Sequence, residues 1–248
     1  MTKRLVALVL AASLSATQAQ AIIGGAEDQG PLARRNVMVL NSNGGVCTAV
    51  VLARDVVLTA AHCVTGAAEY RVHFRYEAGE PVLIDVTDKA VHPGYDAKAI
   101  EKRTRSIDLA LVRIPTPLPG RFEEAVLSTA RPAKDGRVTV GGYGLAREKE
   151  PKTMGTFRST ALTVIEPYGP SRILLWSKGS GATGACQGDS GGPMVSGDAV
   201  AAITSWSSSP TKDGKCGGLT QGILVGAQRE WIDRVLKGWN RGAKWSGD

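Results

Sequence analysis

Residues 184–193 read GACQGDSGGP, and Ser190 lies near the centre of this glycine-rich stretch. Glycines on both sides of a serine let the backbone adopt unusual dihedral angles and approach a substrate closely. The segment GDSGG (188–192) also fits the nucleophile elbow of α/β-hydrolases, but that fold places its histidine after the serine in the chain. No histidine follows Ser190. Any histidine base for this serine must therefore come from upstream.

Three histidines precede Ser190, and their contexts differ. His62 lies among small and apolar residues in LTAAHCV (58–64), next to Cys63, which can anchor the loop that presents it. His73 sits between two arginines on an alternating segment and is predicted to face solvent. His92, in HPGY (92–95), is predicted to be a turn residue. His62 is therefore the candidate base.

Asp108 begins the apolar run LALVRI (109–114). A carboxylate that points into apolar surroundings must be paired or hydrogen-bonded, and an imidazole N–H would satisfy it. Taken alone, Asp108 is also consistent with a cap at the start of a strand.

Short strand-like segments, most of them separated by glycine and proline turns, predict an all-β protein built as a sandwich or as barrels. One stretch, 227–239, carries apolar residues at helical spacing and closes the chain before a polar tail. A proline-rich passage, PTPLPG (115–120), begins the best linker candidate. The predicted strands are 46–53, 55–60, 70–76, 82–88, 109–114, 137–142, 157–165, 172–176, 193–197 and 199–206.

Together, TAAHC, DLAL and GDSGGP occur in the order His, Asp, Ser, and this arrangement resembles the chymotrypsin-like (trypsin-like) serine proteases. IIGG (22–25) resembles the mature N-terminus of that family. Gly142-Tyr143-Gly144 resembles its Gly-Trp-Gly turn, and Ser205-Trp206-Ser207 resembles its Ser-Trp-Gly substrate-binding strand. The closing helix also matches.

The resemblance implies two six-stranded antiparallel β-barrels with the active site in the cleft between them. Residues 22–125 would form the first barrel, and residues 126–248 the second barrel and the C-terminal helix. Four cysteines allow three pairings. The resemblance selects Cys47 with Cys63 and Cys186 with Cys216.

The resemblance also assigns catalytic roles. Ser190 would attack the scissile carbonyl, His62 would act as general base and then general acid, and Asp108 would hold the imidazole. The N–H groups of Gly188 and Ser190 would form the oxyanion hole. No metal or organic cofactor is needed. The freed ammonium of Ile22 would pair with Asp189 and shape the oxyanion hole and the specificity pocket.

The specificity pocket would have Gly184 at its base, with Ser205, Trp206 and Ser207 along one wall. Trypsin-like enzymes keep an aspartate at the base to pair with arginine or lysine, so weak cleavage after these residues is predicted. Counting back from the closing helix places Thr220 on the other wall, which makes the pocket small. Counting forward from Cys216 places Gly222 there and leaves it open.

The basic stretch between His92 and Asp108 contains Lys98, Lys102, Arg103 and Arg105. It would border the sites for substrate residues upstream of the cut, or else form a solvated charged loop. Glu69, Glu77 and Glu80 lie where some relatives bind calcium, but their spacing does not support a site, and no metal is predicted.

Residues 1–21 are predicted to be a signal peptide, with a basic start, a short apolar run and small residues before the cut. The run is too short to span a bilayer. Removing it takes two cationic residues away and lowers the formal charge from +7 to about +5. No nucleic-acid motif is present. The mature protein is predicted to be secreted, not membrane-bound, and monomeric.

The leading interpretation is a secreted serine endopeptidase acting on protein or peptide substrates and open to protein inhibitors. Two alternatives are a catalytically silent relative that binds a partner, and an esterase that uses the same triad. Because Ile22 directly follows the predicted signal cleavage site, no propeptide is expected.

Overall fold

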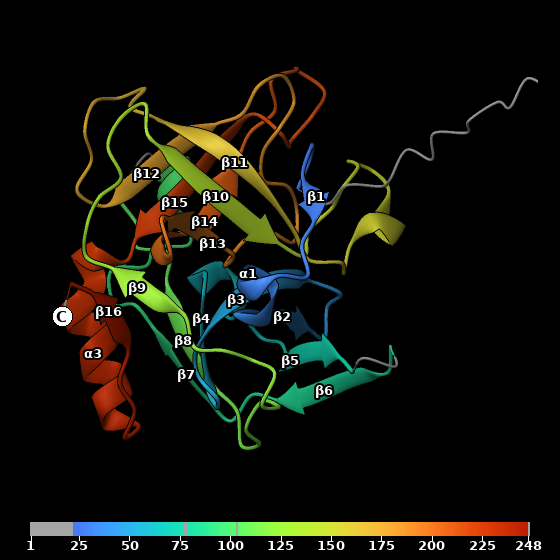
Figure 1. Cartoon of the computed structure of the whole chain (residues 1–248), viewed down its shortest axis with the longest axis vertical. Helices are drawn as coiled ribbons and strands as arrows, with labels where there is room; N and C mark the ends of the chain where they lie inside the picture. Colours follow the sequence, from blue (N-terminus) through green and yellow to red (C-terminus); the bar gives the residue numbers. More distant parts are fainter. Residues whose placement is uncertain (1–21, 77–78, 103, 248) are drawn as a thin grey trace, which may run out of the picture.

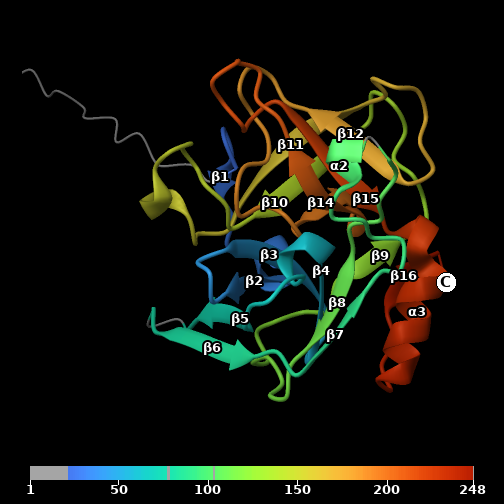
Figure 2. The ribbon, with the colours of Figure 1, turned by 180° about the vertical axis from the view of Figure 1, so that it is seen from behind.

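The computed structural model describes residues 22–76, 79–102 and 104–247. The predicted signal peptide, Glu77 and Arg103 lie outside these residues. Figures 1 and 2 show two β-sheets, one above the other, with the long helix alongside the lower one. The lower sheet holds strands from the first half of the chain, and the upper sheet holds strands from the second half.

The first sheet has the strand order β6-β5-β2-β3-β4-β8-β7 in the described part of the chain. Its two end strands follow one another along the chain and are joined by Val86 and Thr87. The Val86 N–H donates to the Tyr70 carbonyl at 3.0 Å, and the Thr87 N–H donates to the Arg113 carbonyl at 3.0 Å. The sheet is therefore an open half-barrel by strand pairing and returns on itself through this corner. Its strands are β2 (Asn36–Asn41), β3 (Val46–Ala53), β4 (Val56–Thr59), β5 (Tyr70–Arg75), β6 (Pro81–Asp85), β7 (Asp88–Val91) and β8 (Ala110–Arg113).

The second sheet contains a closed ring, β13-β10-β11-β12-β15-β14, which the pairing of β13 with β14 completes. Outside the ring, β1 pairs with β11, and β9 pairs in parallel with both β14 and β16. The predicted all-β, two-barrel architecture is confirmed. The strands are β1 (Ala26–Glu27), β9 (Val126–Ser128), β10 (Arg137–Gly142), β11 (Arg158–Ile165), β12 (Leu174–Lys178), β13 (Pro193–Ser196), β14 (Ala199–Ser207), β15 (Leu219–Leu224) and β16 (Lys244–Ser246).

The helices lie at the edges of this framework. Two short helices, α1 (Pro31–Arg34) and α2 (Ala99–Lys102), lie in the first half of the chain. The helix predicted at 227–239 is α3 (Arg229–Gly238), and a 3-10 turn, Gly226–Gln228, precedes it. Two further 3-10 turns are Ala61–Cys63 and Pro151–Thr153.

One hydrophobic cluster joins both barrels and α3. Leu52 and Leu111 contribute from the first barrel, and Ile203 contributes from the second. Helix α3 adds Ile232 and Leu236, which are fully buried. The boundary predicted at 125/126 stays a prediction, because the chain crosses between the barrels at more than one place.

His73 was predicted to face solvent, and that prediction is wrong. The side chain is only 7% exposed, and its Nδ1 lies 2.8 Å from the Val82 carbonyl oxygen. β5 lies between β2 and β6, and its cross-strand neighbours cover the histidine. His92 does lie at a turn, but it is also buried against Trp231, with ring centroids 4.7 Å apart. Burial lowers its pKa.

Replacement of Ile232 by alanine should destabilise the protein by about 2–5 kcal/mol, because it opens a cavity in the cluster that joins the barrels. Urea unfolding in a Ser190→Ala background, which prevents self-digestion, measures the change. The matched control is Arg234→Ala on the exposed face of the same helix, which should change stability by no more than about 0.5 kcal/mol. Equal effects from the two variants would contradict a core role for this helix face.

Candidate active site

The predicted catalytic side chains come from three separate places in the fold. His62 lies in the 3-10 turn after β4, and Asp108 lies two residues before β8. Both lie in loops of the first barrel. Ser190 lies in the loop before β13 of the second barrel. The structure therefore assembles the candidate site from both barrels.

His62 and Asp108 are in direct contact. The His62 Nδ1–H donates to Asp108 Oδ2 at 2.7 Å, and the His62 backbone N–H donates to Asp108 Oδ1 at 2.9 Å. The Ser205 hydroxyl adds a third hydrogen bond to Oδ2 at 2.6 Å. Burial opposes ionisation of Asp108, but these hydrogen bonds and the His62 charge outweigh it and hold its pKa below the usual range. The imidazole is thus fixed, with Nε2 left as its acceptor nitrogen.

Ser190 is held against the first barrel by β3. The Thr48 N–H donates to the Ser190 carbonyl at 2.8 Å, and the Thr48 hydroxyl donates to the Gly188 carbonyl at 2.9 Å. The Sγ of Cys63 lies 3.7 Å from His62 Nε2 and 3.8 Å from the Ser190 carbonyl oxygen. These contacts bring the serine loop to the imidazole. Thr48 was not singled out from the sequence, because its partners lie 140 residues away.

The predicted disulfides are confirmed. Cys47 pairs with Cys63, and Cys186 pairs with Cys216. The first fixes the turn that carries His62, and the second anchors the segment that leads to Ser190. Cys47, His62 and Cys63 are the one group of potential metal ligands close enough to share an ion among the described residues. Their two sulfurs are already bonded to each other, so the cluster lacks the thiolates that a metal site would use.

The loop before Ser190 has a backbone that requires glycine. Gly188 has φ +96°, and a Cβ built on it would lie 2.7 Å from the Gly144 Cα. Within the described residues, the N–H groups of Gly188 and Ser190 donate to no protein acceptor. The loop therefore presents two adjacent free donors.

Asp189 is completely buried behind this loop. Its carboxylate accepts hydrogen bonds from the N–H groups of Cys186 and Gly144, both at 2.8 Å. Burial raises the pKa of Asp189 to about 7, although these bonds and the charge of Arg158 act in the opposite direction. Ile22 is also fully buried, within the apolar cluster of the second barrel. In the full chain its nitrogen is an amide, so the ion pair with Asp189 stays a prediction.

The pocket residues lie on neighbouring strands. Ser207 pairs with Thr220 between β14 and β15. The Thr220 hydroxyl accepts the Ala185 N–H at 3.0 Å and lies 3.0 Å from a Cβ built on Gly184. A Cβ on Gly222 would instead lie 2.4 Å from the Met194 sulfur, inside the barrel. Thr220 therefore faces Gly184, and Gly222 does not.

Trp206 is the end of an exposed aromatic row that the sequence did not reveal. Its ring centroid lies 6.1 Å from that of Trp176, which in turn lies 5.5 Å from that of Tyr168. Trp206 is 36% exposed and Tyr168 is 79% exposed. The three residues come from different parts of the second half of the chain, so no local pattern marks them.

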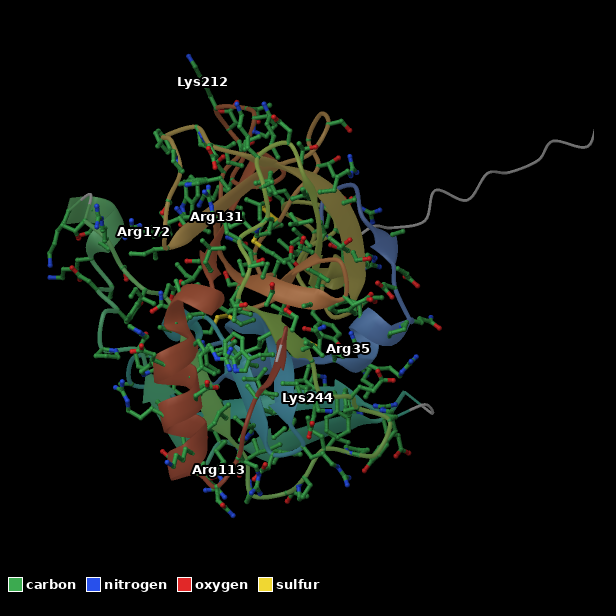
Figure 3. The ribbon with its side chains drawn as sticks, turned by 60° about the vertical axis from the view of Figure 1, so that its left-hand side comes forward. Arg35, Arg113, Arg131, Arg172, Lys212 and Lys244 are labelled. Atoms are coloured by element: carbon green, nitrogen blue, oxygen red, sulfur yellow. A yellow bond between two sulfur atoms is a disulfide. The ribbon has the colours of Figure 1, made fainter. Side chains whose placement is uncertain are left out.

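The basic segment near the site is only partly neutralised. Lys98 and Arg105 are exposed, and the Lys102 ammonium lies 3.1 Å from the Asp96 carboxylate. Elsewhere, basic side chains are spread over both barrels (Figure 3), and among those labelled, Arg35, Arg113, Arg131 and Lys244 lie beside carboxylates. No helix in the described residues has the length and apolarity needed to cross a membrane.

The comparisons with known proteins agree with this geometry. The family model described as trypsin matches residues 22–232. The vitellin-degrading protease of Bombyx mori is 31% identical over 234 residues, which cover 87% of this chain and 85% of that protein. Kallikrein-15 of Homo sapiens is 28% identical over 215 residues, which cover 77% of this chain and 81% of that protein.

Solved structures agree on the fold. Neuropsin, a serine protease of mouse brain, superposes with a TM-score of 0.72 at 22% identity, over 86% of this chain and 99% of that one. The scabies mite inactivated protease paralogue S-D1 gives a TM-score of 0.71 at 18% identity, over 88% of this chain and 98% of that one. The molecule is a two-barrel serine endopeptidase with the chymotrypsin fold, and the chain belongs to the trypsin family.

The buried carboxyl of Asp189 should make the uncut chain less stable as the pH rises. Its pKa is about 7 in the folded chain and about 3.9 in an unfolded one. Its contribution is therefore greatest below pH about 4 and is lost as the pH rises towards 7. The test compares Ser190→Ala chains that carry a short polar extension before Ile22, with and without Asp189→Asn.

Urea unfolding from pH 4 to 8 supplies the measurement. The stability of the parent chain relative to the Asn variant should fall across this range. A difference between the two chains that does not change with pH would show that the carboxyl is not perturbed as described.

Proposed function

We propose that this endopeptidase hydrolyses peptide bonds through His62, Asp108 and Ser190, by way of an acyl-enzyme. The observation that carries the proposal is the fixed His62–Asp108 pair, with its 2.7 Å hydrogen bond, beside the loop that presents Ser190. A serine hydroxyl is a weak nucleophile unless a base within reach removes its proton. His62 Nε2 is that base, because Nδ1 is committed to Asp108.

In the first step, Ser190 Oγ forms a bond to the scissile carbonyl carbon and passes its proton to His62 Nε2. The carbonyl oxygen becomes an anion and accepts hydrogen bonds from the N–H groups of Gly188 and Ser190. Each such donor is worth about 2.7–4 kcal/mol in the transition state. His62 then protonates the leaving amine as the C–N bond breaks. Water, deprotonated by His62, hydrolyses the ester and releases Ser190.

The pocket is proposed to take small or medium apolar side chains. No carboxylate stands at Gly184 to compensate a buried arginine or lysine of the substrate. Thr220 narrows the pocket beside Ser207, its paired neighbour on the adjacent strand, and its side chain is fully buried against Gly184. The exposed Trp206 is proposed to line the path of the residues upstream of the cut.

Activation is proposed to need a single cut, after Ala21. The family match begins at Ile22, and Ile22 is already enclosed by the second barrel. Its φ is +49°, a conformation that a β-branched residue rarely adopts and that costs on the order of 1–3 kcal/mol. Cleavage removes this torsion and creates an ammonium. The two disulfides are consistent with an exported protein.

A peptide-library digest with the mature protein beside Ser190→Ala tests the proposed mechanism. The parent should cut peptides, and the variant should lose essentially all of this activity. Asp108→Asn should lower kcat by roughly 10⁴-fold, because the imidazole loses its tautomer partner. Cleavage by Ser190→Ala at the parent rate would refute the proposed nucleophile.

Thr220→Gly tests the pocket wall. Removing the side chain should raise kcat/KM for leucine or phenylalanine before the scissile bond, relative to alanine, by about 10–200-fold. Thr211→Gly, a control in an exposed loop, should leave the profile unchanged. If both variants retain the parent profile, Thr220 does not line the pocket.

A further inference from the structure

Asp189 is a buried carboxylate whose two hydrogen bonds do not supply a counter-charge. Both donors are neutral backbone N–H groups, from Cys186 and Gly144. A buried ion without a compensating charge is costly, because neutral donors replace only part of its hydration. In the mature enzyme the ammonium of Ile22 would supply one counter-charge. The described residues contain a second candidate.

Arg158 is that second cation. It begins β11 and pairs across the strands with Gly142 of β10. Paired residues of antiparallel strands direct their side chains to the same face. A Cβ built on Gly142 would lie 2.2 Å from the Asp189 Oδ1. Arg158 therefore leaves the sheet on the face that holds the Asp189 carboxylate.

Arg158 is buried, and its one carboxylate partner among the described residues is itself partly exposed to solvent. The side chain is almost entirely buried, with the residue only 3% exposed. One nitrogen, Nη2, lies 3.1 Å from the Glu27 carboxylate. Another, Nη1, donates to the carbonyls of Thr153 and Thr156 at 3.4 Å, and the buried Nε has no partner.

Arg158 and Asp189 do not touch. Both belong to the described part of the chain, and no nitrogen of Arg158 lies within 4.0 Å of an oxygen of Asp189. Between buried groups, however, charges interact over longer distances than they do in water. The charge of Arg158 acts to lower the pKa of Asp189.

We propose that Arg158 is a positioning residue whose buried charge favours the ionised form of the Asp189 carboxylate and so supports the Gly188–Ser190 loop independently of the Ile22 ammonium. This inference rests on the proposed triad mechanism. In this proposal Asp189 has two counter-charges. One is the Ile22 ammonium, which cleavage creates, and the other is the Arg158 guanidinium, which β11 carries before and after cleavage. A chain whose Ile22 nitrogen remains an amide therefore keeps part of its activity.

The test uses two forms of the chain. In the freed form the protein begins at Ile22, and in the blocked form a short polar extension precedes Ile22, with intact mass confirming that it stays attached. Active-site titration and kcat are measured for the parent, Arg158→Gln and Arg158→Lys. In the blocked form Arg158→Gln should lower kcat by about tenfold or more, the equivalent of one pKa unit. Arg158→Lys should restore most of the loss.

Glu27→Gln is the matched control, because it removes the carboxylate partner of Arg158 and leaves the cation in place. The proposal expects the blocked form of this variant to keep or exceed the parent kcat. The proposal is wrong, and Arg158 serves only in packing, if Glu27→Gln and Arg158→Gln lower kcat of the blocked form equally. The same conclusion follows if Arg158→Lys lowers kcat as much as Arg158→Gln does. A different result would refute the proposed function itself: a freed parent enzyme that shows no peptide cleavage dependent on Ser190.

Discussion

One buried carboxylate contacts the active-site loop through two hydrogen bonds. Asp189 has no solvent exposure, and its oxygens hold the N–H groups of Cys186 and Gly144. One donor, Cys186, begins the turn in which Gly188 adopts its positive φ, and the other, Gly144, belongs to the loop after β10. If the carboxylate is displaced, the loop that carries the two free N–H donors loses these fixed contacts. In the proposed mechanism, catalysis depends on a counter-charge for Asp189, and this requirement connects secretion, the N-terminus and β11.

A second constraint places the serine loop against the histidine. Thr48 binds the carbonyls of Ser190 and Gly188 with its N–H and its hydroxyl, and the same hydroxyl accepts the Tyr143 N–H at 3.0 Å. β3 of the first barrel thus holds the loop of the second barrel by hydrogen bonds rather than by covalent linkage. The hydrophobic cluster shared with α3 keeps the barrels together. Rigid strands and a shared core bring the His62–Asp108 pair and the loop that carries Ser190 to the same place between the barrels.

Local motifs predicted much of the site, and contacts between distant segments account for what was missed. TAAHC, DLAL and GDSGGP are each a continuous stretch of sequence. They could therefore be recognised without knowing that the fold brings them together. Counting residues could not choose between Thr220 and Gly222, because the loop between β14 and β15 has no standard length, whereas the strand register places Thr220 opposite Ser207. Alternation along β5 misjudged His73, because its cross-strand neighbours Met38 and Leu83 flank the imidazole, although Arg71 and Arg75 on the same face are exposed. Arg158 carries no local signal at all, since its importance comes from a partner in another segment.

The central claim is that one cut, after Ala21, both exports the chain and supplies the ammonium that Asp189 needs. The most direct measurement is the N-terminal sequence and intact mass of secreted enzyme, combined with titration of its active sites. The account predicts that fully active molecules begin at Ile22, with no intermediate that carries a propeptide. Fully active protein that begins at any other residue would contradict it.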